Sequence, residues 1–553
     1  MQSSNITETG GGVRSIPNPY EISTSTYVKN HIAQSEVKNF VDPDEEISRI
    51  RNETEAVVEA EKQQISAKNT KKTGKNEKEP TKTELLIEIA LRHAELFHDA
   101  DDKSYATIKI NDGYATYPLR NKGFKSWLSS KFWKMYREGI GSQITQDAID
   151  TLEAHAIHEG PCEPVYVRVA GYKGNVYVDL GNDDFEIIEI TRNGWQVLKN
   201  KKEIRFKRPQ GFLPLPYPSN KGNIGILKNF INLEDDSNFP LVIAFLLGCY
   251  HPSGPYPILD TEGEQGTSKS TVQRAIKKLI DPNTAELRSG PKDIRDLAIA
   301  GFNSWLLGFD NLSNIPDWLS DALCRMSTGG GFSTRTLYSD DEETVFDMRR
   351  PLMVNGITNV IRRHDLADRA IRIELGIILE EKRKPEKQFW EEFDAAAPEI
   401  LAGIFDGISC ALDHLESIRI QQFPRMADFF KWISAAEPAM PWPIGTFAEA
   451  YQRNRAEIIE ETVDGDVVAM AVKSLMESRS KWEGTATELL KILNSLVDDQ
   501  IVKSKFWPKA GNSLSGRLKR SATALRSQGI DIQFPRRTRS GQKIIINRIV
   551  TNK

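Results

Sequence analysis

A glycine-rich segment that follows a short apolar run constrains this chain of 553 residues more than any other feature. The segment at residues 263–271 reads GEQGTSKST, and the apolar run at residues 256–259 predicts a strand directly before it. A strand, a glycine-rich turn and a helix in this order are typical of a phosphate-binding loop, in which backbone N–H groups surround the phosphates. Taken by itself, the segment could also be a strand-to-helix turn that binds nothing.

The match to the pattern G-x-x-x-x-G-K-[ST] lacks one glycine. Gly263, Lys269 and Ser270 hold their expected positions, whereas Ser268 stands where the second glycine belongs. Gly266 could supply the flexible turn instead, because glycine adopts left-handed backbone angles without steric cost. We expect the lysine to reach phosphate oxygens and the hydroxyl to bind Mg²⁺. The residues predicted to bind the nucleotide are Gly263, Glu264, Gln265, Gly266, Thr267, Ser268, Lys269, Ser270 and Thr271.

A buried strand further along the chain offers a second metal ligand. Residues 304–309 are mostly apolar, and Asp310 follows them directly. An acidic residue at such a place holds Mg²⁺ in P-loop ATPases, so we expect Asp310 to share the ion with Ser270. Capping of a helix at residues 316–326 is the alternative role for Asp310. Asn311 follows where many ATPases carry a second carboxylate to orient the attacking water, and an amide cannot accept the proton of that water.

Two further polar residues complete a possible catalytic set. Asn355 ends the strand expected at residues 350–355, where its amide could bind the attacking water or simply belong to the next turn. Arg369 has a forked guanidinium that suits γ-phosphate stabilisation across a subunit interface, although alone it would be interpreted as a surface ion-pair partner. The predicted catalytic residues are Lys269, Asp310, Asn355 and Arg369.

Residues 240–380 resemble the superfamily 3 helicases of the AAA+ group, and residues 85–550 resemble phage and mobile-element ATPases of the primase-helicase-like kind. The resemblance implies an α/β AAA+ P-loop core with Walker A at Lys269 and Ser270, and ATP and Mg²⁺ as its ligands. It further implies Walker B at Asp310, sensor 1 at Asn355, a trans-acting finger at Arg369, and a homo-oligomeric ring expected to be a hexamer. The motifs that carry the resemblance are residues 263–266 with 269–270, 309–313, 321–325 with 329–331, 354–357 and 365–369.

The same resemblance implies a β-hairpin that enters the pore of the ring, and residues 332–349 alternate as such a hairpin should. Its turn, residues 339–343, reads SDDEE and is acidic, whereas a tip that contacts DNA should carry basic residues. Arg335, on the flank, could face DNA or pair with these acids.

The C-terminal block is strongly basic. Residues 501–553 contain 13 Lys and Arg against one Asp, in a chain whose total charge is −4. A helix at residues 513–526 followed by a hairpin with its tip at residues 536–541 is the layout of a winged-helix DNA-binding domain. A solvated basic face or a protein-binding winged helix are the alternatives. The predicted DNA-binding residues are Arg335, Arg517, Lys519, Arg520, Arg536, Arg537 and Arg539.

Composition changes divide the chain into five expected parts. They are a mostly disordered polar segment (1–84), an α+β accessory domain (85–215), the ATPase core (223–384), a helical domain (385–478) and the winged helix (482–553). The four cysteines are far apart and form no CxxC pair, and the longest apolar run, residues 241–249, is too short to span a bilayer. We therefore expect a cytoplasmic protein with no membrane contact.

The leading hypothesis is an ATP-dependent DNA helicase or translocase ring, acting on single-stranded or forked DNA in the replication of a phage or mobile element. The second is a DNA-binding ATPase switch that assembles on ATP without unwinding, which Asn311 and the acidic hairpin favour. A primase activity finds no support, since Asp179, Asp183, Asp184 and Glu186 are explained as turn and edge residues.

Overall fold

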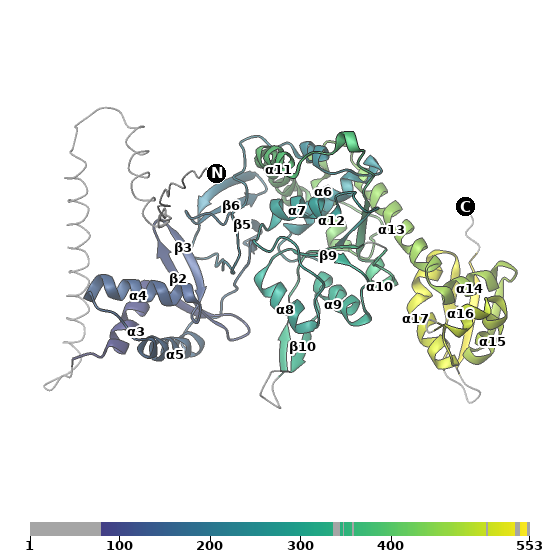
Figure 1. Cartoon of the computed structure of the whole chain (residues 1–553), viewed down its shortest axis with the longest axis horizontal. Coiled ribbons are helices and arrows are strands. Elements are labelled where there is room, and N and C mark those ends of the chain that lie inside the picture. Colours follow the sequence, from purple (N-terminus) through teal and green to yellow (C-terminus); the bar gives the residue numbers. More distant parts are fainter. Residues whose placement is uncertain are drawn as a thin grey trace, which may run out of the picture. The chain divides into compact units, whose positions relative to one another are not determined.

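The computed structural model describes residues 79–335, 343–346, 348–356, 359–504, 507–536 and 542–549 (Figure 1). The expected disorder at residues 1–84 falls almost wholly outside these ranges. The chain divides into two compact units, of which one contributes only residues 79–81 and 129–140 to the described part. The other unit carries the elements below, apart from the second half of helix α4.

The first part of the chain combines three helices with an antiparallel sheet. The apolar run at residues 85–90 predicts a helix that continues to about Phe97, which is wrong: α3 ends at His93 and residues 94–98 form strand β1. Leu96 and Phe97 are buried by pairing with β2, and the ring of Phe97 stacks on that of Tyr105 with centroids 5.5 Å apart. The elements are α3 (Lys82–His93), β1 (Ala94–His98), β2 (Ser104–Ile110), β3 (Gly113–Pro118), α4 (Lys122–Tyr136) and α5 (Ser142–His158).

A second antiparallel sheet follows in the order β4-β5-β6-β7. It packs against the long helix α11 (Glu386–His414): Trp195 meets Phe405 edge to face at 5.6 Å, and Ser409 Oγ donates to Thr191 O at 2.7 Å. The strands are β4 (Val169–Tyr172), β5 (Asn175–Asp179), β6 (Glu186–Thr191) and β7 (Gly194–Lys199).

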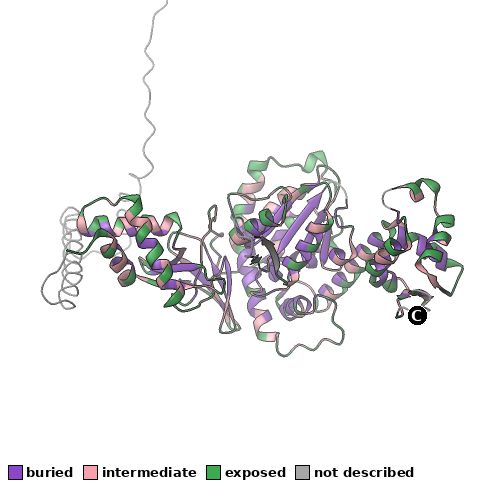
Figure 2. Ribbon diagram, turned by 90° about the horizontal axis from the view of Figure 1, so that it is seen from below, coloured by how far each residue is buried: buried purple, intermediate pink, exposed green. Residues whose placement is uncertain are grey.

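The centre of the molecule is a four-stranded parallel sheet in the order β13-β8-β12-β9. Its strands are almost entirely buried, as Figure 2 shows, which is typical of parallel sheets with both faces covered. Neighbouring residues point to opposite faces, so that Leu259 and Met353 belong to one core and Ile258 and Leu352 to another. The strands are β8 (Ile258–Glu262), β9 (Leu307–Leu312), β12 (Leu352–Gly356) and β13 (Ala370–Glu374).

Helices cover each face of this sheet. The larger core contains side chains of α6 (Phe239–Cys249), α7 (Lys269–Ile280), α11, α12 (Ala427–Ala436) and α13 (Thr446–Asp464). The smaller core contains side chains of α8 (Ile294–Asn303), α9 (Asp317–Thr328) and α10 (His364–Ala367). Short connecting elements are η1 (Ile224–Phe230), η2 (Asp236–Asn238), η3 (Glu380–Lys382), η4 (Glu437–Ala439) and the hairpin strands β10 (Phe332–Arg335) and β11 (Glu343–Phe346).

Helix α11 is the one described helix that is long and apolar enough to cross a membrane. Its apolar residues, among them Phe393, Ile400, Leu401 and Ile404, are fully buried against α6, α12 and η1. Its apolar character is therefore accounted for by the protein core.

The last part of the chain has a separate small core. Its sheet has the order β14-β16-β15, and Trp482, Leu514, Leu518 and Ile546 are buried between this sheet and the helices. The elements are α14 (Val467–Glu477), β14 (Lys481–Thr485), α15 (Ala486–Leu496), α16 (Asp499–Lys503), α17 (Gly511–Ser527), β15 (Ile530–Gln533) and β16 (Lys543–Arg548).

Candidate functional site

The segment at residues 263–271 connects β8 to α7 at the carboxyl edge of the parallel sheet. Gly263 and Gly266 have φ angles of +144° and +89°, and Ser268 has φ +64° directly before the helix. A Cβ on Gly263 would lie 2.8 Å from Leu375 O, so no larger residue fits there. Ser268 itself takes the left-handed conformation that the missing glycine would take. Gly266 therefore does not replace that glycine; it adds another residue with a positive φ angle to the loop.

Lys269 and Ser270 occupy the first turn of α7. The Lys269 ammonium donates to the carbonyl oxygens of Gly263 (2.7 Å) and Glu264 (2.8 Å) and is thus held over the loop. Thr267 Oγ1 also donates to Glu264 O, at 2.9 Å. The lysine therefore lies at the concave side of the loop, where phosphate oxygens would meet it.

Asp310, Asn355 and Ser270 come together although they are far apart in the sequence. Asp310 Oδ1 accepts hydrogen bonds from Ser270 Oγ and from Asn355 Nδ2, both at 2.8 Å. Among the described residues no group of three His, Cys, Asp or Glu side chains could hold a metal. A hydroxyl and one carboxylate suit Mg²⁺, which takes few protein ligands and completes its shell with phosphates and water.

Gln273 lies behind this cluster, and the sequence did not single it out. Its fully buried amide donates to Val354 O (2.9 Å) and Thr261 Oγ1 (3.2 Å) and accepts from Asn355 Nδ2 (2.8 Å). Gln273 therefore fixes the orientation of the Asn355 amide. The signal that could have revealed it is a polar residue three positions after Ser270, on the apolar face of an amphipathic helix.

Asn311 has φ +55°, a conformation that asparagine tolerates better than most residues. Its backbone N–H donates to Asn355 Oδ1 at 2.8 Å. The backbone N–H of Asn311 therefore fixes the carbonyl oxygen of the Asn355 amide.

Arg369 is not brought to the loop of its own chain. It directly precedes β13, which runs parallel to β8, so it lies at the amino edge of the sheet while the loop leaves the carboxyl edge. The five residues of β13, at about 3.3 Å each, separate the two edges by about 16 Å. Arg369 Nη1 donates to Asp365 O at 2.5 Å, and its Nε is buried without a hydrogen-bond partner.

A buried charge cluster joins β13 to β8, the strand that leads into the loop. Arg372 Nε lies 3.1 Å from Asp260 Oδ2 and 3.2 Å from Glu262 Oε1, and its Nη1 bonds Glu461 of α13. Burial, and for Glu262 also the neighbouring Asp260 charge, raises the pKa of both carboxyl groups. A charged residue inside an apolar strand is the only sign of this cluster in the sequence.

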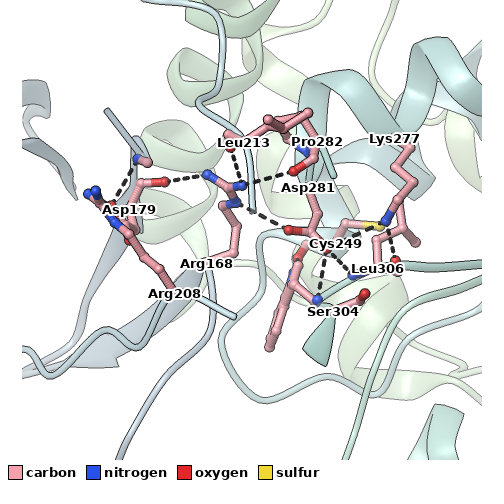
Figure 3. A network of polar contacts seen from close by, with 12 residues as sticks. Arg168, Asp179, Arg208, Leu213, Cys249, Lys277, Asp281, Pro282, Ser304 and Leu306 are labelled. Carbon is pink, nitrogen blue, oxygen red and sulfur yellow. Dashed lines mark hydrogen bonds and ion pairs between the residues drawn. The ribbon is translucent and has the colours of Figure 1, made fainter. Parts of the chain in front are cut away.

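A second buried cluster joins β4 and β5 to the far end of α7, as Figure 3 shows. Arg168 is completely buried and donates to Asp281 Oδ1 (3.3 Å), Asp179 O (2.8 Å) and Leu213 O (2.7 Å). Burial lowers the pKa of Arg168; burial alone would raise that of Asp281, but Lys277 and Arg168 hold it below its usual value. The Asp179 carboxylate pairs with both Nε and Nη2 of Arg208.

Asp179, Asp184 and Glu186 each have a structural partner in this region. Asp184 and Glu186 both pair with Lys199, and Asp179 is a buried ion-pair member whose carboxylate also accepts from the Gly181 N–H at 2.9 Å, in the turn that follows β5.

The predicted DNA-binding residues are described only in part. Arg537, Arg539 and the side chain of Arg335 lie outside the described residues, as does most of the acidic hairpin turn. Lys519 and Arg520 are exposed on α17, Arg517 is half-buried there, and Arg536 is exposed after β15. Arg350, beside the hairpin, donates to Gly301 O and Ser304 O.

A pocket of about 670 Å³ opens next to the loop. Gly266, Ser268 and Thr271 line one side, and the segment around Ile377 and Phe389 lines the other. Its place beside a phosphate-type loop and its mixed apolar and basic walls fit a nucleotide.

Two family models match the chain. Residues 224–448 match the model of the actinomycete integrative conjugative element replication protein, and residues 468–552 match that of the AICE RepA C-terminal domain. No curated protein matches the chain.

Two similar solved structures have low sequence identity to this chain. The apo C-terminal region of NrS-1 has 13% identity and a TM-score of 0.38, with 85% of this chain and 100% of that chain covered. A JCV helicase with a bound substituted N-phenylacetamide has 11% identity and a TM-score of 0.21, with 40% of this chain and 66% of that chain covered. By its two family matches, the chain is similar from residue 224 to residue 552, apart from residues 449–467, to a replication protein of a mobile element.

Proposed function

We propose that this protein is an ATP-dependent DNA helicase or translocase that works as an oligomeric ring in the replication of a mobile genetic element. The observation that carries the proposal is the convergence of Ser270 Oγ and Asn355 Nδ2 on Asp310 Oδ1, beside a loop over which Lys269 is held. Ligands of parallel sheets bind at the carboxyl edge, where the strand order changes direction, and β8 is the strand at that point.

Each residue of the cluster has a distinct role in this proposal. Lys269 and the loop N–H groups hold the phosphates, and Ser270 and Asp310 would hold Mg²⁺, which neutralises phosphate charge when bound. Asn355, oriented by Gln273 and the Asn311 N–H, positions the attacking water. Arg369 of a neighbouring subunit stabilises the charge that develops during hydrolysis, which makes ring assembly part of the mechanism.

The C-terminal part supports contact with DNA. Helix α17 is followed by strands β15 and β16, which form a three-stranded sheet with β14, and this order of elements supports the proposed winged helix. Its basic residues suit the phosphate backbone, which dominates affinity for DNA. The match of residues 468–552 to the C-terminal domain of a replication protein agrees with this role.

The alternative is a DNA-binding ATPase switch that assembles on ATP without unwinding. The specific observation in its favour is Asn311, which provides no carboxylate beside Asp310 to accept a proton from water.

ATPase and strand-displacement assays on the full chain, with and without forked DNA, test the proposal. We expect Lys269→Ala to abolish ATP binding or turnover, since the Lys269 ammonium is the cation that the Gly263 and Glu264 carbonyl oxygens hold over the loop. Lys278→Ala, at the other end of α7, is the matched control and should retain activity. Full ATPase activity of Lys269→Ala would refute the site, and assembly on ATP without strand displacement would favour the switch.

A further inference from the structure

The pocket beside the loop has two walls that are fixed to the central sheet. One wall is residues 228–232, at the end of η1, and the other is residues 377–384, which follow β13. Gly376 N donates to Asn232 O at 2.9 Å, and Asn232 Nδ2 donates back to Gly376 O. Because Leu375 N in turn donates to Glu262 O at 2.9 Å, both walls are held against the start of the loop.

The apolar part of the pocket wall is unusually exposed. Ile377 and Leu379 have 64% and 52% of their surface accessible, and Phe389 lines the pocket near them. Apolar side chains that reach solvent at the mouth of a pocket offer a surface for a flat ring system.

Most of the cations that line this pocket are already paired. Arg274 pairs with Glu286 and Glu386. Lys384 pairs with Glu392, and Lys228 with Asp236. Lys382 and Arg383 are the lining cations with no carboxylate partner among the described residues.

Arg383 lies directly over the loop. Its Nη2 is 3.7 Å from the position that a Cβ on Gly266 would take, and no other atom comes within 4 Å of that position. Its Nε donates to Ile378 O at 3.4 Å, so the Nη groups keep their hydrogen-bonding capacity. A planar, permanently charged fork above a loop of backbone N–H groups is well suited to phosphate oxygens.

We propose that Arg383 binds the phosphates of a nucleoside di- or triphosphate held by the loop of its own subunit, and that the base lies against Ile377, Leu379 and Phe389. This inference rests on the proposed function, because it takes the loop as the phosphate site. It gives the site two arginines with separate origins: Arg383 from the same chain, and Arg369 from a neighbour.

Binding measurements with two probes separate the phosphate contact from the base contact. The dissociation constants of ATP and of inorganic tripolyphosphate are measured on the full chain by titration calorimetry with Mg²⁺ present. Arg383→Ala should weaken both probes by about 10- to 100-fold, the usual loss for hydrogen bonds to a charged group. Leu379→Ala should weaken ATP alone, and Arg383→Lys should recover part of the loss, because it keeps the charge without the fork.

Lys387→Ala, an exposed cation of α11 that pairs with Glu391 and does not line the pocket, is the control and should bind both probes normally. Unchanged affinity of Arg383→Ala for both probes, together with loss of binding in Lys269→Ala, would overturn this inference and leave the proposed function intact. Normal ATP binding by Lys269→Ala would overturn both. If Leu379→Ala weakened the affinity for both probes equally, the base would not lie against Ile377, Leu379 and Phe389.

Discussion

Ser268 shows how a single residue can keep a loop conformation that its sequence does not favour. A left-handed conformation costs a residue with a Cβ about 1–2 kcal/mol relative to glycine. Ser268 nevertheless has φ +64° and ψ +30°. Helix α7 begins directly after Ser268, and the start of the loop at Gly263 lies close to Leu375 O, so both ends of the loop are held in place.

Ser268→Gly should therefore stabilise the protein by about 1 kcal/mol without loss of ATP binding, because glycine adopts the same angles without strain. Urea denaturation and ATP titration of the two proteins measure the effect. Ser268→Ala, which keeps the Cβ, is the control and should show no gain. A gain in both variants would locate the effect in the hydroxyl instead of the backbone.

His251 gives the protein a pH-dependent stability. Its half-buried ring lies edge-on against Trp432, and Nδ1 accepts from the Ser253 N–H at 3.3 Å, so the neutral ring is the form that fits. Burial, opposed in part by the Asp428 charge, lowers the pKa of His251 from 6.5 to about 4. A lowered pKa in the folded state means that stability is complete above pH 6.5 and is lost as the pH falls towards 4.

The loss attributable to His251 reaches about 3 kcal/mol at pH 4, at 1.36 kcal/mol for each pKa unit. Urea denaturation at several pH values should show a shallower decline for His251→Gln, whose side chain stays neutral. His158→Gln, at an exposed position of α5, should decline as the parent protein does. A His251→Gln curve parallel to that of the parent would rule out this contribution.

At the scale of elements, α17 is expected to determine the salt dependence of DNA binding. Its exposed Lys519 and Arg520, with Arg536 after β15, have no carboxylate partner among the described residues, whereas Arg526 is paired with Asp531. Replacing these three residues by alanine should weaken binding and reduce the slope of log K against log [salt] by about 3, because each phosphate that is no longer neutralised lowers the slope by about 0.9.

Fluorescence anisotropy at several salt concentrations measures this slope. Lys491→Ala, on α15 of the same domain, is the control. An unchanged slope of log K against log [salt] in the triple variant would show that these residues of α17 and Arg536 do not contact the DNA phosphates.

The elements also show where sequence patterns reach their limit. The strands and helices around the loop follow from apolar runs and were located correctly to within a few residues. The strand at residues 94–98 was missed because its pairing with β2, and not its own sequence, ends the preceding helix. Gln273 and Arg372 were missed because their roles depend on partners far along the chain, such as Val354, Asp260 and Glu461.

At the scale of the whole molecule, the position of Arg369 makes a test of ring assembly possible. Arg369→Ala should bind ATP within about twofold of the parent and lose hydrolysis by about 10³-fold or more, as for other arginine fingers. Mixing it with Asp310→Asn should restore part of the activity, since one variant supplies an intact loop and the other an intact arginine.

Each variant alone is the control in this mixing experiment, and a mass measurement of the mixture shows that mixed assemblies form. Mixed assemblies without any regained activity would exclude a site shared between subunits.

Strand β13 has a consequence for a ring built in this way. Its first end carries Arg369, which would face the neighbour's nucleotide, and its other end leads to residues 377–384, beside the nucleotide of its own subunit. The strand pairs with β8 along all five residues and is buried from Ala370 to Ile373, so we expect it to move together with β8. In the proposed ring, a shift of this strand pair would link the occupancy of one site to the position of Arg369 at the next, and such a link favours hydrolysis in order around the ring.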